Sequence, residues 1–127
     1  MSQPGDFRGQ TGRRGENIAA SWLISHGYRV IERNWRRPCG ELDLIAECDG
    51  EVVAVEVKTR RGDAMGAPEE AITPAKQRKL IATLQTYLME RGIEQAAYRI
   101  DVIAVRLDRA GRWLETVHYP SAVALEG

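Results

Sequence analysis

The sequence has little cysteine, few aromatic residues, no excess charge of either sign and no long hydrophobic run. Of its 127 residues, two are cysteine and 6% are aromatic, and 18 basic side chains balance 18 acidic ones. No apolar segment approaches the roughly 20 residues that a membrane-spanning helix needs, and the polar start of the chain lacks the apolar centre of a signal peptide. We therefore expect a cytoplasmic protein with no membrane partner.

The two cysteines, Cys39 and Cys48, do not predict a metal centre. Two thiols cannot complete a structural zinc site, and neither His26 nor His118 stands at ligand spacing from them. A net charge of zero disfavours a protein that coats nucleic acid without specificity. The basic residues are nevertheless clustered along the chain, so a local basic surface stays open.

The hydrophobic pattern predicts an α/β fold in the order helix, three strands, helix, two strands. We expect residues 1–10 to form a disordered arm and residues 11–127 to form one domain. The expected helices span 11–26 and 74–91, and the expected strands span 28–35, 41–47, 51–60, 97–107 and 112–119. The result is a mixed β-sheet of about five strands flanked by helices.

Local signals set the boundaries of these elements. Thr11 and Thr73 are capping residues, and Thr73 is followed by proline at the first helical position. Gly27 stands just beyond the expected end of the first helix. Asp49-Gly50 predicts a two-residue hairpin between the second and third strands. The long helix after the third strand is a crossover, so the third and fourth strands should be parallel.

Charged residues interrupt the most apolar, most strand-like segment of the chain. Asp43 lies in the second strand, and Glu56 and Lys58 share one face of the third. If the hairpin turns at Asp49-Gly50, Asp43 pairs with Glu56 and two carboxylates face each other. Such a pair repels unless a positive group lies between them.

A hard divalent cation, Mg²⁺ or Mn²⁺, satisfies this arrangement because it takes oxygen ligands and needs only one or two carboxylates. Lys58 would then orient a water or hold a phosphate oxygen. Glu16, on the inner side of the first helix, would contribute a carboxylate through water. The alternative is an ordinary charged strand face with cross-strand ion pairs, and a Glu16 that is favoured only by the helix dipole.

The residues Asp43 and Glu56-Val57-Lys58 resemble the D…(D/E)-x-K motif of restriction-endonuclease-like nucleases. The longer stretch from "GRRGENIAASWLISHGYRV" through "GELDLIAECDGEVVAVEVKTR" to "ITPAKQRKLIATLQTYL" and "YRIDVIAV" resembles the YraN-like family, relatives of archaeal Holliday-junction resolvases. The similarity runs from about Gly12 to Val123. It implies a restriction-endonuclease-like core and, by analogy with the junction-cutting relatives, a homodimer, for which the sequence shows no exposed apolar stripe.

The resemblance also implies roles for individual residues. Asp43, Glu56 and the backbone carbonyl of Val57 would be metal ligands, and Lys58 would be the catalytic lysine. Glu16 matches a glutamate that junction resolvases add to the site from their first helix. Gln77 stands where some nucleases of this superfamily carry a glutamine that faces the site.

Further residues are candidates for the site or its rim. Phosphate contacts are expected from the basic residues Arg13, Arg14, Arg60, Arg61, Lys76 and Lys79, the alternative being a solvated surface. Asp101 either faces the site or pairs with Arg99, and Glu41 is either a site residue or a salt-bridge partner. Trp22, Trp35 and Trp113 form no periodic stacking platform, so we expect them mainly in the core.

The sequence supports three hypotheses for function. The first is a metal-dependent endonuclease that hydrolyses phosphodiester bonds in DNA, including branched or junction DNA. The second is a non-catalytic nucleic-acid-binding protein that retains the nuclease fold. The third is a small domain whose charged strand face meets a protein partner.

Overall fold

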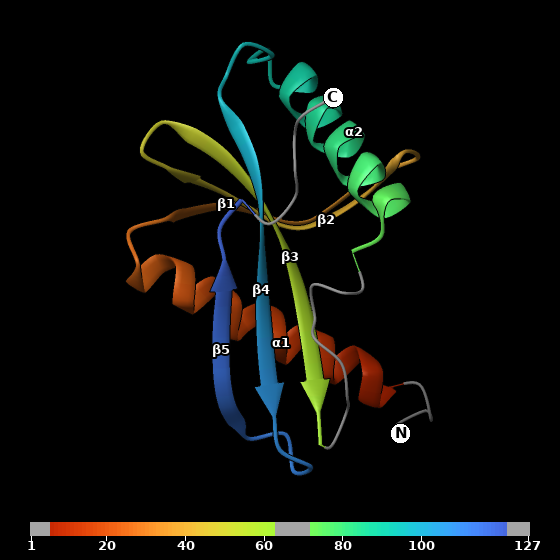
Figure 1. Ribbon diagram of the computed structural model, residues 1–127, viewed down its shortest axis with the longest axis vertical. Coiled ribbons are helices and arrows are strands. Elements are labelled where there is room, and N and C mark those ends of the chain that lie inside the picture. The colour runs from red at the N-terminus through yellow and green to blue at the C-terminus, as the bar shows by residue number, and fades with distance from the viewer. Residues whose placement is uncertain (1–5, 63–71, 122–127) are drawn as a thin grey trace.

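A five-stranded mixed β-sheet carries one helix on each face (Figure 1). The computed structural model describes residues 6–62 and 72–121, with side chains from Gly9 onward. The elements follow in the order α1 (Asp6–Ser25), β1 (Arg29–Arg37), β2 (Gly40–Cys48), β3 (Glu51–Arg61), α2 (Pro74–Glu90), β4 (Tyr98–Leu107) and β5 (Trp113–Tyr119). This order, and the α/β class, confirm the prediction from sequence.

The strands are arranged in the sheet in the same order as in the sequence, β1-β2-β3-β4-β5. Strands β1 to β3 form an antiparallel meander, β4 is parallel to β3, and β5 is antiparallel to β4. The expected turn joins β2 to β3, because Asp49 and Gly50 have φ values of 50° and 80°, which a type I′ turn requires. The parallel β3–β4 pair is connected through α2, as the crossover rule predicts.

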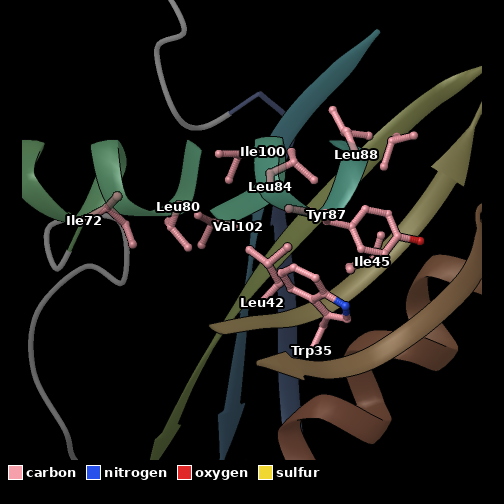
Figure 2. Close-up of a cluster of buried hydrophobic side chains, with 12 residues drawn as sticks. Trp35, Leu42, Ile45, Ile72, Leu80, Leu84, Tyr87, Leu88, Ile100 and Val102 are labelled. Carbon is pink, nitrogen blue, oxygen red and sulfur yellow. The ribbon is translucent and has the colours of Figure 1, made fainter. Parts of the chain in front are cut away.

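Two hydrophobic clusters hold the helices to the sheet. On one face, Leu80, Leu84 and Leu88 of α2 pack on a cluster that includes Trp35 and Val102 (Figure 2). On the other face, Ala19, Ala20 and Leu23 of α1 pack against the second cluster, which includes Leu44, Val53, Val55, Ile103 and Val105. Central strands β3 and β4 are apolar on both sides for this reason.

The ends of the helices mostly follow their capping signals. The hydroxyl of Thr73 accepts a hydrogen bond from the Lys76 amide at 3.2 Å and caps α2, and Gly27 ends α1 with a φ of 87°. However, α1 begins at Asp6, five residues before the expected cap at Thr11, so the helix starts earlier than predicted and includes residues 6–10 of the expected arm. The content of Gly, Pro, Gln and Ser in residues 1–10 favours the later start.

Helix α1 makes a close approach to the sheet at Gly15. A Cβ atom at this position would lie 1.9 Å from Thr59 Oγ1 and 2.9 Å from Thr59 Cβ. Because the Thr59 side chain is β-branched and short, it cannot move away as a long side chain would. The absence of a side chain at Gly15 therefore lets the helix pack directly on β3, one residue before Glu16.

Some predictions about the surface need correction or fall outside the described residues. Trp35 is buried, but Trp113 is 52% exposed on the edge strand β5, where its indole donates to Thr116 Oγ1 at 2.8 Å. The expected loop between Arg61 and Ile72 falls mainly on residues outside the described ranges. Within residues 6–62 and 72–121, no helix has the length and hydrophobicity needed to cross a membrane.

Candidate functional site

Asp43 and Glu56 converge at the point where β2 and β3 separate. The strand register pairs Leu44 with Val55, so the next position brings Asp43 opposite Glu56, as the hairpin signal predicts. The backbone amide of Val57 donates to Asp43 Oδ2 at 2.8 Å, so the Asp43 side chain takes the place of a backbone partner. The two acidic side chains are therefore neighbours on adjacent strands.

The alternation of faces along β2 is interrupted at Asp43. Leu42 packs in the cluster beneath α2, whereas Leu44 packs in the cluster beneath α1. Residues two apart normally share a face, so the strand must rotate between these leucines. Asn34, on the neighbouring strand β1, has a φ of 53° and marks a matching irregularity. This distortion places the Asp43 carboxylate at the border between the two faces.

The backbone carbonyl of Val57 faces the same gap. In an antiparallel pair, the amide and the carbonyl of one residue point to the same neighbouring strand. Because the Val57 amide points to Asp43 on β2, its carbonyl does so as well. The donor set of Asp43, Glu56 and this carbonyl consists of hard oxygen atoms, which fit Mg²⁺ or Mn²⁺ that keeps several waters.

Two lysines neutralise Glu56. Lys58 Nζ lies 3.4 Å from Glu56 Oε2, and Lys76 Nζ, from the first turn of α2, lies 3.3 Å from the same oxygen. The side chains of Lys58 and Glu56 are only 14% and 10% exposed, whereas that of Lys76 is 39% exposed. Burial, followed by the neighbouring Lys76, lowers the pKa of Lys58.

Burial and negative neighbours raise the pKa of Asp43 to about 8. Desolvation is the main cause, repulsion from Glu56 adds to it, and the hydrogen bond from the Val57 amide opposes both. Glu16 adds a smaller repulsion. The fold therefore holds Asp43 where its charged form is unfavourable until a positive group approaches.

Replacing Asp43 with asparagine is expected to stabilise the ion-free protein at pH 8 to 9 by about 1–3 kcal/mol. The pKa of Asp43 is raised in the folded protein relative to its ordinary value of 3.8. The favourable contribution of Asp43 to the free energy of unfolding is thus complete below about pH 4. It is lost as the pH rises through about 8. Urea unfolding in EDTA at pH 5 and pH 9 measures the difference, which should be smaller at pH 5 than at pH 9. Equal effects at both pH values would contradict this prediction.

A large hollow of about 800 Å³ opens beside the acidic pair, and we call it the arginine hollow. It lies between the N-terminal half of α1, the C-terminal half of β3 and the β4–β5 turn. Its lining residues are Thr11, Gly12, Glu16, Asp43, Val57, Lys58, Thr59, Arg60, Arg61 and Arg109. A smaller hollow of about 250 Å³, the lysine hollow, is lined by Glu41, Asp43, Glu56, Lys76, Lys79, Leu80 and Thr83. Asp43 borders both.

Glu16 reaches the arginine hollow from α1, but it does not complete a three-carboxylate cluster. In the described part of the chain, no group of three or more His, Cys, Asp or Glu side chains is placed to hold a metal ion. The donor set is therefore limited to Asp43, Glu56 and the Val57 carbonyl. Glu16 lies at the rim of the hollow with Asp43 and Lys58, where a water-mediated role remains a prediction.

Gln77 contacts the backbone just before α2. Its side-chain amide donates to the carbonyl of Ile72 at 3.2 Å, so it secures the residues just before α2. It is not among the described residues that line the hollows around Asp43. The glutamine predicted to face the site thus has a structural contact in this geometry.

The predicted phosphate-binding residues divide between the hollows. Arg60 and Arg61 line the arginine hollow, and Lys76 and Lys79 line the lysine hollow. Arg13 lines a third hollow, of about 580 Å³, which it shares with Glu16 and Asp43.

Two of the arginines also hold the β4–β5 turn in place. Arg14 donates to the Gly111 carbonyl at 2.5 Å, and Arg61 donates to the Arg109 carbonyl at 3.1 Å. Arg109 is a charged lining residue that the sequence did not predict. Its turn lies far from the acidic residues in sequence, and only the β3–β4 pairing brings it near.

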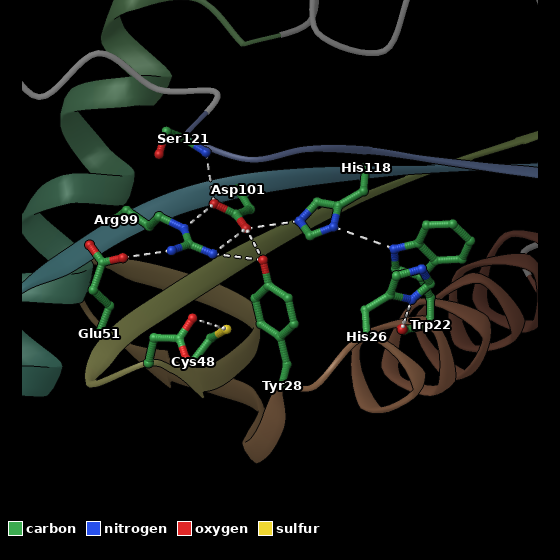
Figure 3. Close-up of polar contacts among 10 residues, drawn as sticks. Trp22, His26, Tyr28, Cys48, Glu51, Arg99, Asp101, His118 and Ser121 are labelled. Atoms are coloured by element: carbon green, nitrogen blue, oxygen red, sulfur yellow. Dashed lines mark hydrogen bonds and ion pairs between the residues drawn. The ribbon is translucent and has the colours of Figure 1, made fainter.

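Asp101 belongs to a separate polar network and not to the acidic pair (Figure 3). It is fully buried and accepts hydrogen bonds from Arg99 at 3.0 Å, from His118 at 2.8 Å and from the Ser121 amide at 2.8 Å. Asp101 is in register with Val55, whose side chain faces α1. Of the two alternatives predicted for Asp101, the pair with Arg99 is observed.

Glu41 is both a salt-bridge partner and a neighbour of the acidic pair, the two alternatives predicted for it. Its carboxylate forms a salt bridge to Arg36 at 2.9 Å. It also borders the lysine hollow with Asp43 and Glu56. Glu41 is 39% exposed, so its charge acts on the rim and is screened by solvent.

Comparison with known proteins places the chain among close relatives. A "UPF0102 protein" of Syntrophotalea carbinolica is 46% identical over 116 residues, which cover 91% of this chain and 93% of the relative. A second, from Symbiobacterium thermophilum, is 48% identical over 103 residues, covering 81% and 87%.

A solved structure, that of Pyrococcus furiosus SfsA in complex with Ca²⁺, aligns with a TM-score of 0.38 at 17% identity, over 91% of this chain and 64% of that one. This likeness is too distant to indicate a function. The family model described as "Uncharacterised protein family UPF0102" matches residues 15–105. With that match and these relatives, the chain belongs to the UPF0102 family.

Proposed function

We propose that this protein is a metal-dependent nuclease that hydrolyses phosphodiester bonds in DNA, with branched or junction DNA as the substrate to test first. The observation that carries the proposal is the convergence of Asp43 and Glu56 beside Lys58 at the point where β2 and β3 separate. Two carboxylates, a backbone carbonyl and a largely buried lysine form a set of groups suited to phosphoryl chemistry.

Asp43, Glu56 and the Val57 carbonyl would hold Mg²⁺ or Mn²⁺. Such an ion supplies positive charge against the phosphate and makes water a stronger nucleophile near neutral pH. The Lys58 ammonium, beside the carboxylate of Glu56, donates a hydrogen bond to a phosphate oxygen or orients the attacking water. Glu16, which also lines the arginine hollow, would orient a water there.

The surroundings of the acidic pair favour a polyanionic substrate. Lys58, Arg60, Arg61 and Arg109 contribute four positive side chains to the lining of the arginine hollow. Arginine and lysine beside a metal site bind phosphates and steer a charged chain towards it. Because the net charge of the chain is zero, this positive surface is local and would act through the site.

Cleavage of a panel of labelled DNAs tests the proposal. The panel contains a four-way junction, a forked duplex, a linear duplex and a single strand, each incubated with Mn²⁺, with Mg²⁺ or with EDTA. We expect cleavage of at least one DNA with either ion and none in EDTA. DNA binding that no ion changes, without cleavage of any substrate, would support the alternative of a non-catalytic binding protein. No binding of any nucleic acid at low salt would contradict both.

A further inference from the structure

One carboxylate oxygen of Glu56 has two ammonium groups beside it, and they come from different elements. Lys58 lies two residues along the same strand, and its position is fixed by β3. Lys76 comes from α2, eighteen residues beyond Lys58, and lies 3.3 Å from the same Oε2 atom. Lys58 alone could neutralise Glu56, and Lys76 adds a second positive charge in the hollow that Glu56 and Asp43 both line.

The two lysines differ in how easily they can leave Glu56. The Lys58 side chain is 14% exposed, whereas the Lys76 side chain is 39% exposed. An ammonium that leaves a carboxylate must be rehydrated, which is easier at the more exposed position. Lys76 is therefore the lysine that can leave Glu56 at the lower cost.

A divalent ion at Glu56 and the ammonium of Lys76 repel each other. Both would lie within a few ångströms of one carboxylate oxygen, where like charges interact strongly. The lysine hollow next to Glu56 gives the displaced side chain somewhere to go, since Lys76 already lines it together with Lys79. A phosphate in this hollow would provide a new counter-charge for the ammonium.

We propose that Lys76 is a tethered competitor of the divalent ion at Glu56, and that ion binding releases its ammonium to contact a phosphate oxygen of the substrate. The proposal rests on the proposed function and adds a coupling between ion and substrate. Before the ion binds, Lys76 neutralises Glu56. After it binds, the same charge is available to DNA, so each ligand favours the binding of the other.

The first test measures Mn²⁺ affinity by calorimetry in the absence of DNA. Lys76→Met removes the competitor and is expected to tighten Mn²⁺ binding about three- to tenfold. The matched control is Lys79→Met, which removes a lysine from the next turn of α2 and the same hollow, and should change the affinity less than twofold. Unchanged or weaker binding by Lys76→Met, with normal binding by the wild type, would overturn this inference and leave the nuclease proposal standing. Failure of the wild type to bind Mn²⁺ would overturn both.

The second test measures DNA binding by fluorescence anisotropy, in a Lys58→Ala background that prevents cleavage. We expect Lys76→Met to weaken binding about three- to tenfold when Mn²⁺ is present and by less than twofold in EDTA. Lys79→Met should give the same change in both conditions. An equal loss for Lys76→Met with and without Mn²⁺ would make Lys76 an ordinary phosphate contact and overturn the coupling.

Discussion

Glu56→Gln and Asp43→Asn are each expected to lower the rate of ion-dependent DNA cleavage by at least about a thousandfold. Each change replaces a charged oxygen ligand with a neutral amide and leaves the shape of the side chain nearly unchanged. Loss of the ion's ligand removes several kcal/mol of stabilisation from the transition state, and each 1.36 kcal/mol corresponds to a factor of ten in rate. The effect is measured as the single-turnover cleavage rate, with Mn²⁺ at a concentration that saturates the wild-type protein.

A control separates this loss from the effect of removing a carboxylate elsewhere in the sheet. Glu115→Gln removes a carboxylate from the edge strand β5, where Glu115 pairs with Arg106 at 3.4 Å and both side chains are more than half exposed. Its cleavage rate should match that of the wild type. If Glu56→Gln retained more than a tenth of the wild-type rate, Glu56 would not be an essential ligand and the site would have to lie elsewhere.

Asp101→Asn is expected to lower the free energy of unfolding by about 3–5 kcal/mol, the largest effect on stability that the structure predicts. The buried carboxylate joins Arg99 and His118 and accepts from the Ser121 amide, while Tyr28 donates to it more weakly at 3.4 Å. Asparagine keeps part of the shape but removes the buried charged partner of Arg99, whose guanidinium keeps its contact with the more exposed Glu51 at 2.6 Å. Urea unfolding at pH 7 measures the loss, and a value below 1 kcal/mol would contradict the prediction.

The effect of Asp101→Asn should depend on pH with a definite sign. Burial alone would raise the pKa of Asp101, but hydrogen bonds from His118, Arg99 and the Ser121 amide lower it below its ordinary value of 3.8. The contribution of Asp101 to the free energy of unfolding is therefore complete above about pH 4. It is lost as the pH falls through the lowered pKa. The difference in stability between wild type and Asp101→Asn should narrow between pH 5 and pH 2.

The acidic pair could be predicted from sequence because its geometry depends on a short-range signal. Asp49-Gly50 sets the turn, the turn sets the register of β2 and β3, and the register places Asp43 opposite Glu56. The same holds for α2, whose start follows from Thr73 and Pro74. In each case a few neighbouring residues determine the local backbone, so no knowledge of the tertiary structure is needed.

The rest of the site depends on packing between distant segments. Lys76 is an ordinary basic residue in the sequence, and only the docking of α2 on the sheet places it against Glu56. Arg109 enters the arginine hollow because the β4–β5 turn lies near the end of β3. The position of Asp101 depends on which face of β4 it occupies, and an apolar strand that is covered on both faces gives no alternation from which to read that face.

The contact between Gly15 and Thr59 affects how far Glu16 lies from the acidic pair. Here the helix backbone rests directly on the Thr59 side chain, so this contact sets the separation of α1 from β3. A larger side chain at position 15 would tilt the amino-terminal end of α1. It would move Glu16 and its neighbouring arginines away from the sheet. The width of the entrance to the acidic pair is thus governed by a residue that has no functional group of its own.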